Sequence, residues 1–196
     1  MVEMNINKGK IILISGPSGV GKKTILDEIL NNKNLNIVYS ISATTRPKRH
    51  NEIHGKDYYF LSRNEFENGI NQGDFLEYAE FCGNYYGTPK QKIFEQLNQG
   101  KNVLLEIETL GAKNIMQQFD KDKIISVFLI PPSLDILRQR LINRGTETLE
   151  TIDKRVQKAS DELKYQDMYQ NIVVNDNVNQ TIKEITKIIE QSYDKK

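Results

Sequence analysis

A glycine-rich segment that ends in two lysines and a threonine carries the clearest chemical signal in this sequence. Residues 16–24 read Gly-Pro-Ser-Gly-Val-Gly-Lys-Lys-Thr, between an apolar run at 11–14 and an amphipathic stretch at 25–30. Glycines let consecutive backbone N–H groups turn inward around phosphate oxygens, and the start of a helix adds its positive dipole end. The pattern predicts a strand, a phosphate-binding loop and a helix, with Lys22 reaching the β- and γ-phosphates of a nucleoside triphosphate.

The position after Lys22 departs from the usual form of such loops. A serine or threonine commonly stands there and meets Mg²⁺ through its hydroxyl, whereas this chain has Lys23 and places the hydroxyl at Thr24. We expect phosphate binding to survive this change, with Mg²⁺ held mainly by phosphates and waters. The alternative, a turn that binds nothing, leaves the three glycines unexplained. The predicted ATP-binding residues of the loop are Gly16, Pro17, Ser18, Gly19, Val20, Gly21, Lys22, Lys23 and Thr24.

Two arginines and several hydroxyls form a second cluster at residues 40–49. Arg46 and Arg49 lie three apart beside Ser42 and Thr44, in a stretch that Pro47 holds open. Guanidinium forks and hydroxyl donors suit a phosphate monoester. Taken alone, the cluster is equally compatible with a solvated basic loop.

The segments that follow make this cluster recognisable. Gly-Lys-Asp-Tyr at 55–58, Phe-Leu-Glu at 75–77 and Gly-Asn-Tyr-Tyr-Gly-Thr at 83–88 follow Ser-x-Thr-Thr-Arg-Pro-x-Arg at 42–49. In order and spacing these motifs resemble those of guanylate kinases, and the resemblance extends from the phosphate loop to the final strand. It implies that Arg46, Arg49, Tyr58 and Tyr86 hold the phosphate of GMP, while Ser42, Glu77 and Thr88 face the guanine.

The chemistry of guanine agrees with a role for Glu77. Guanine presents adjacent N1–H and N2–H₂ donors, which one ionised carboxylate accepts together, whereas adenine offers an acceptor at N1 and no 2-amino group. Tyrosines gathered in one region are more often half-buried packing residues than ligands, so Tyr58 and Tyr86 depend on the resemblance for their roles. Glu77 is therefore the residue that we expect to select the base.

Two further carboxylates follow the buried run at 103–105. Glu106 and Glu108 are two residues apart on an expected strand and so point to the same face. At the carboxyl end of a parallel strand that face opens on the crevice where ligands bind, and the alternative is a charged strand end in water. The resemblance places one carboxylate near the Mg²⁺ water shell and the GMP phosphate and the other near the guanine, where the family often has aspartate.

A third basic set surrounds the loop at 143–148, where Gly145 allows a sharp helix break. The segment resembles the lid of nucleoside monophosphate kinases, although arginines on an exposed helix are commonly solvated or paired with glutamates. The resemblance assigns Arg140, Arg144 and Arg155 to the ATP phosphates and the transferred group, gives Arg138 a weaker claim, and places Asn175 near the adenine of ATP.

The elements that must position these residues alternate along most of the chain. Extended segments are expected near 10–15, 36–42, 57–61, 75–81, 103–105, 124–130 and 171–174, with helices near 22–32, from 64, and at 90–99, 110–118, 133–143, 147–166 and 178–192. Parallel strands need crossover connections and cover on both faces. The prediction is an α/β, three-layer P-loop fold with a central parallel sheet, an inserted mixed or antiparallel GMP-binding lobe and a helical lid. All belong to one domain, with the core at about 1–35, 90–136 and 168–196, the lobe at about 36–89 and the lid at about 137–167.

Composition narrows the class of partner. The 196 residues include 27 Lys and Arg against 26 Asp and Glu, and this net charge of +1 gives no support for a nucleic-acid or other polyanionic partner. The single cysteine, Cys82, cannot form an intramolecular disulfide, and no stretch is apolar for the roughly 18 residues that a membrane span needs. We expect a soluble cytoplasmic protein with small-molecule substrates and no membrane partner, and the oligomeric state stays open.

Together these signals predict an ATP-dependent guanylate kinase that uses Mg²⁺ and transfers the γ-phosphoryl group of ATP to GMP or dGMP. One alternative is a non-catalytic guanylate-kinase-like domain that binds phosphorylated peptides, and the phosphate loop argues against it. The other is a kinase for a different nucleoside monophosphate, and Glu77 with Ser42 and Thr88 argues against that. The predicted catalytic residues are Lys22, Arg46, Arg140, Arg144 and Arg155.

Overall fold

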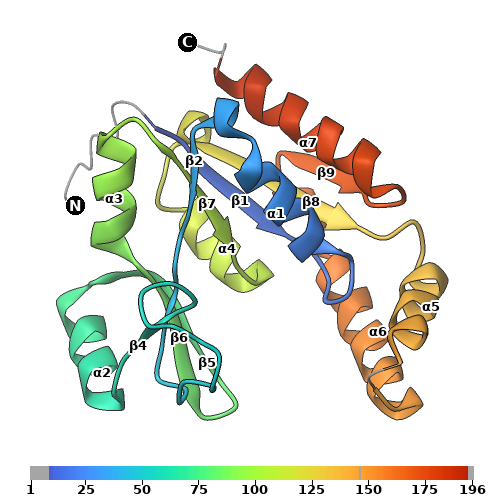
Figure 1. The fold of residues 1–196 in the computed structure, drawn as a ribbon, viewed down its shortest axis with the longest axis horizontal. Coiled ribbons are helices and arrows are strands. Elements are labelled where there is room, and N and C mark those ends of the chain that lie inside the picture. The colour runs from blue at the N-terminus through green and yellow to red at the C-terminus, as the bar shows by residue number, and fades with distance from the viewer. Residues whose placement is uncertain (1–8, 146, 194–196) are drawn as a thin grey trace.

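The computed structural model describes residues 9–145 and 147–193 and shows a main sheet covered by helices, with two smaller parts beside it (Figure 1). The main sheet contains β1 (Ile11–Ser15), β2 (Ile37–Tyr39), β7 (Asn102–Glu106), β8 (Ile124–Ile130) and β9 (Asn171–Val174), in the order β2-β7-β1-β8-β9. Every neighbouring pair in it is parallel. The central position of β1 places the loop that follows it in the middle of the carboxyl edge of the sheet.

Apolar side chains on both faces of the main sheet explain its three layers. In β1, Ile12 and Ile14 pack with α1 (Lys22–Asn31) and α7 (Val178–Tyr193), whereas Ile11 and Leu13 pack with α3 (Lys90–Asn98) and α4 (Thr109–Met116). Successive strand residues point to opposite faces, so a continuous apolar run is buried on both. The predicted three-layer α/β architecture is confirmed. Within the described residues, no helix is long and apolar enough to cross a membrane.

A second sheet forms the smaller part at the lower left of Figure 1, and we call residues 43–89 the sheet lobe. Its strands are β3 (Ala43–Thr44), β4 (Tyr59–Phe60), β5 (Phe75–Phe81) and β6 (Asn84–Pro89), in the order β4-β3-β6-β5. The β3–β4 pair is parallel and the other pairs are antiparallel, so the sheet is mixed. Phe66 of α2 (Arg63–Gln72) stacks on Phe75 and Tyr85, which joins this helix to the sheet.

Two helices form the part at the lower right of Figure 1, α5 (Leu134–Arg144) and α6 (Leu149–Leu163), and we call residues 134–163 the helical lobe. They share a small apolar core that includes Leu137, Leu141 and Ile152. Gly145 ends α5 with a φ of 66°, a left-handed conformation that favours glycine, so the predicted helix break is confirmed. Short 3₁₀ turns elsewhere in the chain are η1 (Lys33–Leu35), η2 (Lys121–Lys123) and η3 (Gln166–Met168).

The observed elements differ from the expected ones mainly in the sheet lobe. β3 and β6 were not among the expected strands, because β3 has two residues and β6 runs through Gly87 and Pro89, which are poor strand formers. β2 pairs with β7 in the main sheet. The sheet lobe therefore begins later than the expected boundary at 36.

Candidate active site

The loop between β1 and α1 requires glycine for its backbone and for its close neighbours. Gly16, Gly19 and Gly21 have φ values of 148°, 92° and 101°, which side chains rarely adopt. A Cβ at Gly19 would lie 2.9 Å from the side chain of Leu141, and one at Gly21 would lie 2.7 Å from Nδ2 of Asn175. The helical lobe and the segment after β9 thus pack directly against the loop.

Lys22 is the first residue of α1, and its ammonium group turns back toward the carbonyls of this loop. Nζ donates to the carbonyl oxygen of Gly16 at 2.6 Å and to that of Pro17 at 3.3 Å. Burial lowers the pKa of Lys22, and nearby carboxylates, with Glu106 the largest contributor, oppose that lowering. A partly desolvated cation at the start of a helix is well suited to bind a phosphate.

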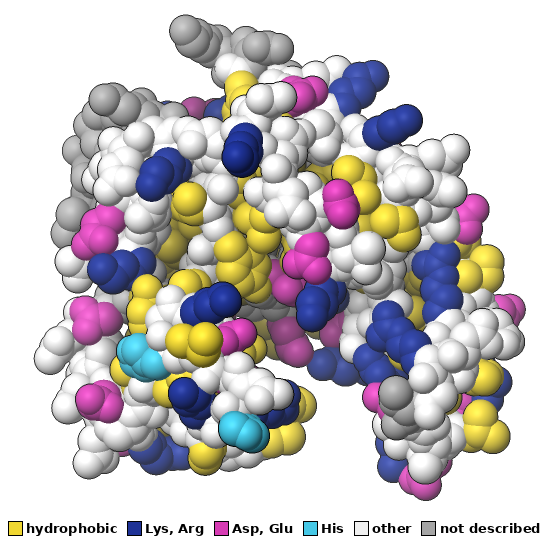
Figure 2. Space-filling model, viewed as in Figure 1, with side chains coloured by type: hydrophobic (Ala, Val, Ile, Leu, Met, Phe, Trp, Pro, Cys, Tyr) yellow, Lys and Arg dark blue, Asp and Glu magenta, His cyan; other side chains and the backbone are white. Residues whose placement is uncertain are grey.

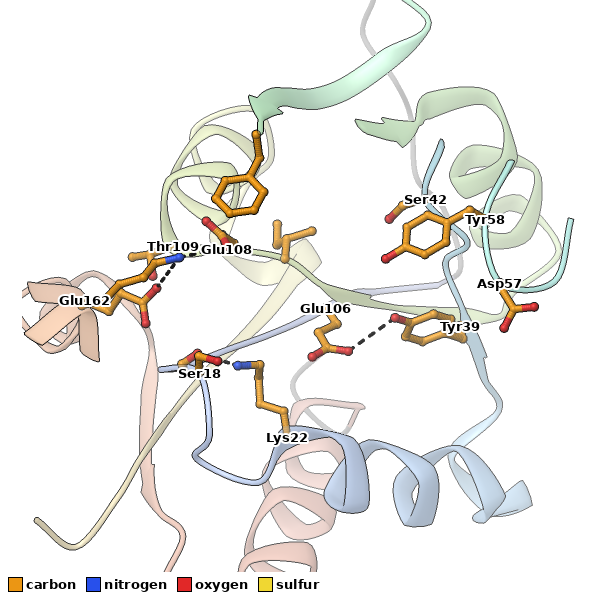
Figure 3. A pocket seen from close by; sticks show the side chains of 14 residues that line it. Ser18, Lys22, Tyr39, Ser42, Asp57, Tyr58, Glu106, Glu108, Thr109 and Glu162 are labelled. Atoms are coloured by element: carbon orange, nitrogen blue, oxygen red, sulfur yellow. Dashed lines mark hydrogen bonds and ion pairs between the residues drawn. The ribbon is translucent and has the colours of Figure 1, made fainter. Parts of the chain in front are cut away.

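A cavity of about 500 Å³ connects the phosphate loop to the sheet lobe. Ser18 and Lys22 line it from the loop, while Tyr58 of the sheet lobe and Ser42, the residue before β3, line it from the other side. Figure 3 shows Lys22 and Glu106 projecting into the same space, with Ser42 and Tyr58 across from them. In Figure 2 the space between the two lobes is visible, with acidic and basic side chains gathered at its inner end.

A second cavity, of about 520 Å³, continues from the first into the sheet lobe. Glu77, Tyr86 and Gly111 line it. The residues common to both cavities are Ser42, Tyr58, Phe81, Glu106, Ile107 and Glu108. The two cavities therefore adjoin each other, with Lys22 in the lining of the first and Glu77 in the lining of the second.

Glu77 lies in the wall of the second cavity with one hydrogen bond already in place. Oγ1 of Thr88 donates to Oε1 of Glu77 at 2.5 Å. Burial raises the pKa of Glu77, and the bond from Thr88 opposes that rise. On the other side, a Cβ at Gly111 of α4 would lie 2.8 Å from Oε2 of Glu77. The carboxylate is thus confined between two segments, and its remaining lone pairs can accept N–H donors from the cavity.

Arg46 is paired with a carboxylate that the sequence did not single out. Its Nη2 donates to Oε1 of Glu52 at 2.7 Å and its Nη1 to Oε2 at 3.1 Å. The guanidinium also lies 5.5 Å from the ring centroid of Tyr58, which meets Tyr86 edge to face at 6.3 Å. The side chain of Arg49 is exposed, and its backbone N–H donates to Glu52. The four predicted phosphate ligands therefore belong to one region of the sheet lobe, with Arg49 at its surface.

Arg155 is the predicted lid arginine that contacts the phosphate loop in this structure. Its Nη1 donates to both carboxylate oxygens of Glu147 at 2.6 Å, and its Nη2 donates to Oγ of Ser18 at 2.6 Å. These bonds join the helical lobe to the loop. Arg138, which had the weaker claim, pairs with Asp153 within the helical lobe.

The other two lid arginines lie at a third cavity, beside Gly19 and Gly21. Arg140 donates to the backbone carbonyls of Asn175 and Asp176 at 2.8 and 3.2 Å, and Arg144 is exposed. The structure thus places Arg140 against the turn after β9, whereas the resemblance assigned it to the ATP phosphates.

Asn175 is almost fully buried, with 2% of its surface exposed. Its Nδ2 donates to the carbonyl oxygen of Val20 at 2.6 Å, and its Oδ1 accepts from Oγ1 of Thr181 at 3.1 Å. The resemblance placed this residue near the adenine of ATP. In the structure its side chain turns into the phosphate loop and fixes the loop backbone.

The oxygen donors at the site fit a magnesium ion that takes most of its ligands from phosphates and water. The described residues contain no group of three or more His, Cys, Asp or Glu arranged to hold a metal. Lys23 and Thr24 are exposed on α1, while Glu106 and Glu108 line both cavities near Lys22. Carboxylates are ligands that Mg²⁺ accepts directly or through water, so these two are the protein groups that suit it.

Several cavity residues escaped the sequence analysis because their partners are distant or irregularly spaced. Tyr39, Lys158 and Glu162 line the first cavity. Two further carboxylates, Glu52 and Glu147, were also missed, and they pair with the predicted site residues Arg46 and Arg155. Lys158 forms ion pairs with Glu162, one helical turn away, and with Glu108, the residue before α4. The spacing of Lys158 and Glu162 is a detectable signal, but it is equally typical of a solvated helix face.

Two anion-binding regions that face one cavity are what a kinase needs when both of its substrates carry phosphate. With the phosphate loop at the carboxyl edge of a parallel sheet, the fold and the site define a P-loop kinase.

Comparison with known proteins narrows this class. The family model described as guanylate kinase matches residues 8–192. The guanylate kinase of Malacoplasma penetrans is 48% identical over 96% of this chain and 96% of its own, and that of Clostridium tetani is 47% identical over 94% and 86%. The crystal structure of guanylate kinase from Anaplasma phagocytophilum has a TM-score of 0.73 and 33% identity over 94% of this chain and 86% of its own. The chain belongs to the guanylate kinase family, and the prediction of that family is confirmed.

Proposed function

We propose that this protein transfers the γ-phosphoryl group of ATP to the phosphate of GMP, and of dGMP, giving ADP and the nucleoside diphosphate. Membership of the guanylate kinase family supports an ATP:GMP phosphotransferase. The observation that carries the proposal is that the two cavities adjoin, with Lys22 in the lining of one and Glu77 in the lining of the other. Adjoining cavities let two polyanions approach in line while the protein neutralises the charge between them.

On the donor side, backbone N–H groups of the phosphate loop and the ammonium group of Lys22 bind the phosphates of ATP. Arg155 supplies a second positive charge, because its bond to Ser18 already holds it at the loop. Arg140 and Arg144 complete the predicted set from the adjoining cavity, and the backbone beside Asn175 borders the same space.

On the acceptor side, Arg46, Arg49, Tyr58 and Tyr86 hold the phosphate of GMP, while Ser42 and Thr88 assist Glu77 at the guanine. The acceptor is already an anion, so the reaction needs no strong general base. Catalysis then rests on orientation and on positive charge placed before the reaction begins. The cavity geometry supports this division because Glu77 and Tyr86 line only the second cavity, whereas Ser18 and Lys22 line only the first.

Magnesium belongs with the donor nucleotide in this proposal, and Glu106 and Glu108 are the residues that would hold its water shell. When bound with ATP, the ion would supply positive charge that offsets the charge on the transferred group. A cytoplasmic location stays a prediction.

A panel of nucleoside monophosphates tests the proposal. With ATP as donor in a coupled assay, we expect GMP and dGMP to be phosphorylated far better than AMP, CMP or UMP. Equal use of AMP would contradict the assignment of the acceptor, and the lack of any transfer would favour a domain that only binds phosphorylated ligands. Replacing Arg46 by alanine should raise the KM for GMP and leave the KM for ATP unchanged, which tests the acceptor end by itself.

A further inference from the structure

In the loop between β3 and β4, the carboxylate of Glu52 accepts several hydrogen bonds from residues 46–49. Oε1 and Oε2 of Glu52 accept from the two terminal nitrogens of Arg46, and Oε2 also accepts from the backbone N–H of Arg49 at 2.8 Å. The backbone N–H of Glu52 donates to the carbonyl oxygen of Arg49 at 3.1 Å. The side chains of Arg46 and Glu52 are 17% and 16% exposed, so both partners are largely removed from water.

The arrangement of these bonds leaves a usable edge on Arg46. Glu52 takes one N–H from each terminal nitrogen, and the carbonyl oxygen of Pro47 takes another from Nη1 at 2.8 Å. A guanidinium carries five N–H donors, and the remaining pair, on Nε and Nη2, lies on the edge that neither Glu52 nor Pro47 occupies. Two parallel N–H groups on one edge match two oxygens of a phosphate.

We propose that Glu52 is a positioning residue for the acceptor phosphate, which fixes Arg46 so that its Nε–Nη2 edge is available to the phosphate beside Tyr58 and Tyr86. This inference rests on the proposed role of Arg46 in binding GMP. Glu52 does not touch the substrate in this scheme. It acts by ordering a flexible side chain before the phosphate arrives, and by closing the 46–52 turn through the backbone of Arg49.

Competition between Glu52 and the phosphate for Arg46 is the opposite reading, and the geometry disfavours it. A carboxylate that competes would have to leave when the phosphate binds, yet here it occupies a different edge of the guanidinium. The rings of Tyr58 and Phe60, 5.5 and 5.9 Å from the guanidinium carbon, further restrict how Arg46 can turn. The pKa of Arg46 is raised first by its bond to Glu52, and Tyr86, a predicted phosphate ligand, adds to that rise. Tyr86 is therefore close to Arg46 while Glu52 is in place.

The test is steady-state kinetics on Glu52→Gln and Glu52→Asp, with GMP and ATP varied separately. Glutamine keeps the shape of the side chain but offers one acceptor oxygen, so Arg46 loses its fixed orientation. We expect the KM for GMP to rise roughly 10- to 100-fold, the order of effect that a small misplacement causes. The KM for ATP should stay within about twofold, since the donor residues lie on other segments. Aspartate, which keeps the charge but is one methylene shorter, should give an intermediate KM.

Glu67→Gln is the matched control. Glu67 pairs with Arg63 at 2.9 Å in the same lobe, but that pair is 51% and 43% exposed and does not line either cavity. We expect Glu67→Gln to leave both KM values unchanged. A similar KM rise in Glu67→Gln would mean that Glu52 acts only through the stability of the lobe, and would overturn the inference.

A double-mutant cycle on the KM for GMP separates the inference from the proposed function. If Glu52 acts through Arg46, adding Glu52→Gln to Arg46→Ala should change the KM little. The positioning role is overturned if Glu52→Gln raises the KM for GMP equally with and without Arg46→Ala, or if it lowers that KM. Either result leaves the proposed role of Arg46 in place. If Arg46→Ala alone leaves the use of GMP unchanged, the proposed acceptor site itself is wrong. Thermal unfolding of each variant shows that it is folded, and if Glu52→Gln does not fold, Glu52→Asp carries the comparison.

Discussion

Replacing Glu77 with glutamine tests how the protein selects its base. The ionised carboxylate can accept from both N1–H and N2–H₂ of guanine, whereas the glutamine amide offers one acceptor oxygen and a donor N–H₂ group. Thr88 donates to Oε1 at 2.5 Å and Gly111 limits movement on the side of Oε2, so the amide has little room to adjust. Whichever way it turns, one N–H of guanine loses its acceptor and faces another donor.

The size of the effect follows from the hydrogen bond that is lost. A bond to a charged group contributes about 1.5–3 kcal/mol. This corresponds to a loss of about 10- to 150-fold in kcat/KM for GMP. For IMP, which has N1–H but no 2-amino group, the glutamine oxygen can still meet N1–H, so the loss should be smaller. For AMP the amide N–H₂ can donate to N1, and its use should rise relative to GMP.

The assay is a coupled measurement of kcat/KM for GMP, IMP and AMP in the wild type and in Glu77→Gln at saturating ATP. We expect the preference for GMP over both other bases to fall. If kcat/KM fell by the same factor for GMP, IMP and AMP, so that the ratio of kcat/KM for GMP to that for AMP did not change, base selection by Glu77 would be refuted. The KM for ATP serves as the internal control and should not change.

The pH dependence of the same variant provides a second readout. Burial raises the pKa of Glu77 above the usual value of about 4.3. Acidification therefore protonates Glu77 earlier than an ordinary glutamate and removes the acceptor for guanine, so wild-type kcat/KM should show an acidic limb that is absent from Glu77→Gln. The free energy of unfolding changes in the opposite direction to activity. It rises on acidification, because the folded protein binds the proton of Glu77 more tightly than the unfolded chain does. Glu77→Gln should therefore unfold at a higher temperature than wild type at neutral pH, and the difference should disappear below about pH 4.

Three further variants test single features of the structure. Gly111→Ala places a methyl group 2.8 Å from Glu77 and should raise the KM for GMP several-fold without changing the KM for ATP, and equal KM values would show that the carboxylate moves freely. Asn175→Asp removes the N–H donor to the carbonyl oxygen of Val20, so the KM for ATP should rise and the melting temperature should fall. If neither value changes, this hydrogen bond does not hold the phosphate loop in place. Cys82 has a φ of 49° beside a glycine in the β5–β6 turn, so Cys82→Asn should raise the free energy of unfolding by about 0.5–1 kcal/mol in denaturant titrations, and a decrease would contradict this.

The main sheet could be predicted because its sequence pattern is local. The bounds of β8 and β9 match the expected strands, since long apolar runs between helices permit few other interpretations. The phosphate loop was predictable for the same reason, as its glycines and Lys22 are contiguous. β3 and β6 were not, because their pairing is determined by partners far along the chain and their residues have weak strand preference.

The sequence motifs single out candidate site residues, but they do not predict the individual contacts of those residues. The hydrogen bond of Asn175 to Val20 joins residues 155 positions apart, and no periodicity in the sequence reports such a contact. Arg140 likewise turns to backbone carbonyls that follow β9. The carboxylate partners of Arg46 and Arg155 lie six and eight residues away in irregular loops, where a glutamate is indistinguishable from a solvated one.

Two of the predicted phosphate-binding arginines, Arg46 and Arg155, are held in different ways, and under the proposed function this difference affects the order of events. Arg46 is fixed within one loop by Glu52, so under the proposed function phosphate can bind to its Nε–Nη2 edge without breaking the bonds to Glu52. Arg155 donates from Nη2 to Ser18 of the phosphate loop, 137 residues away. A phosphate bound in that loop can replace the Ser18 hydroxyl as the acceptor, since a charged oxygen is the stronger partner of a guanidinium. Binding of ATP would then convert a contact between the helical lobe and the loop into a contact through the substrate, whereas the acceptor end stays ready for GMP at all times.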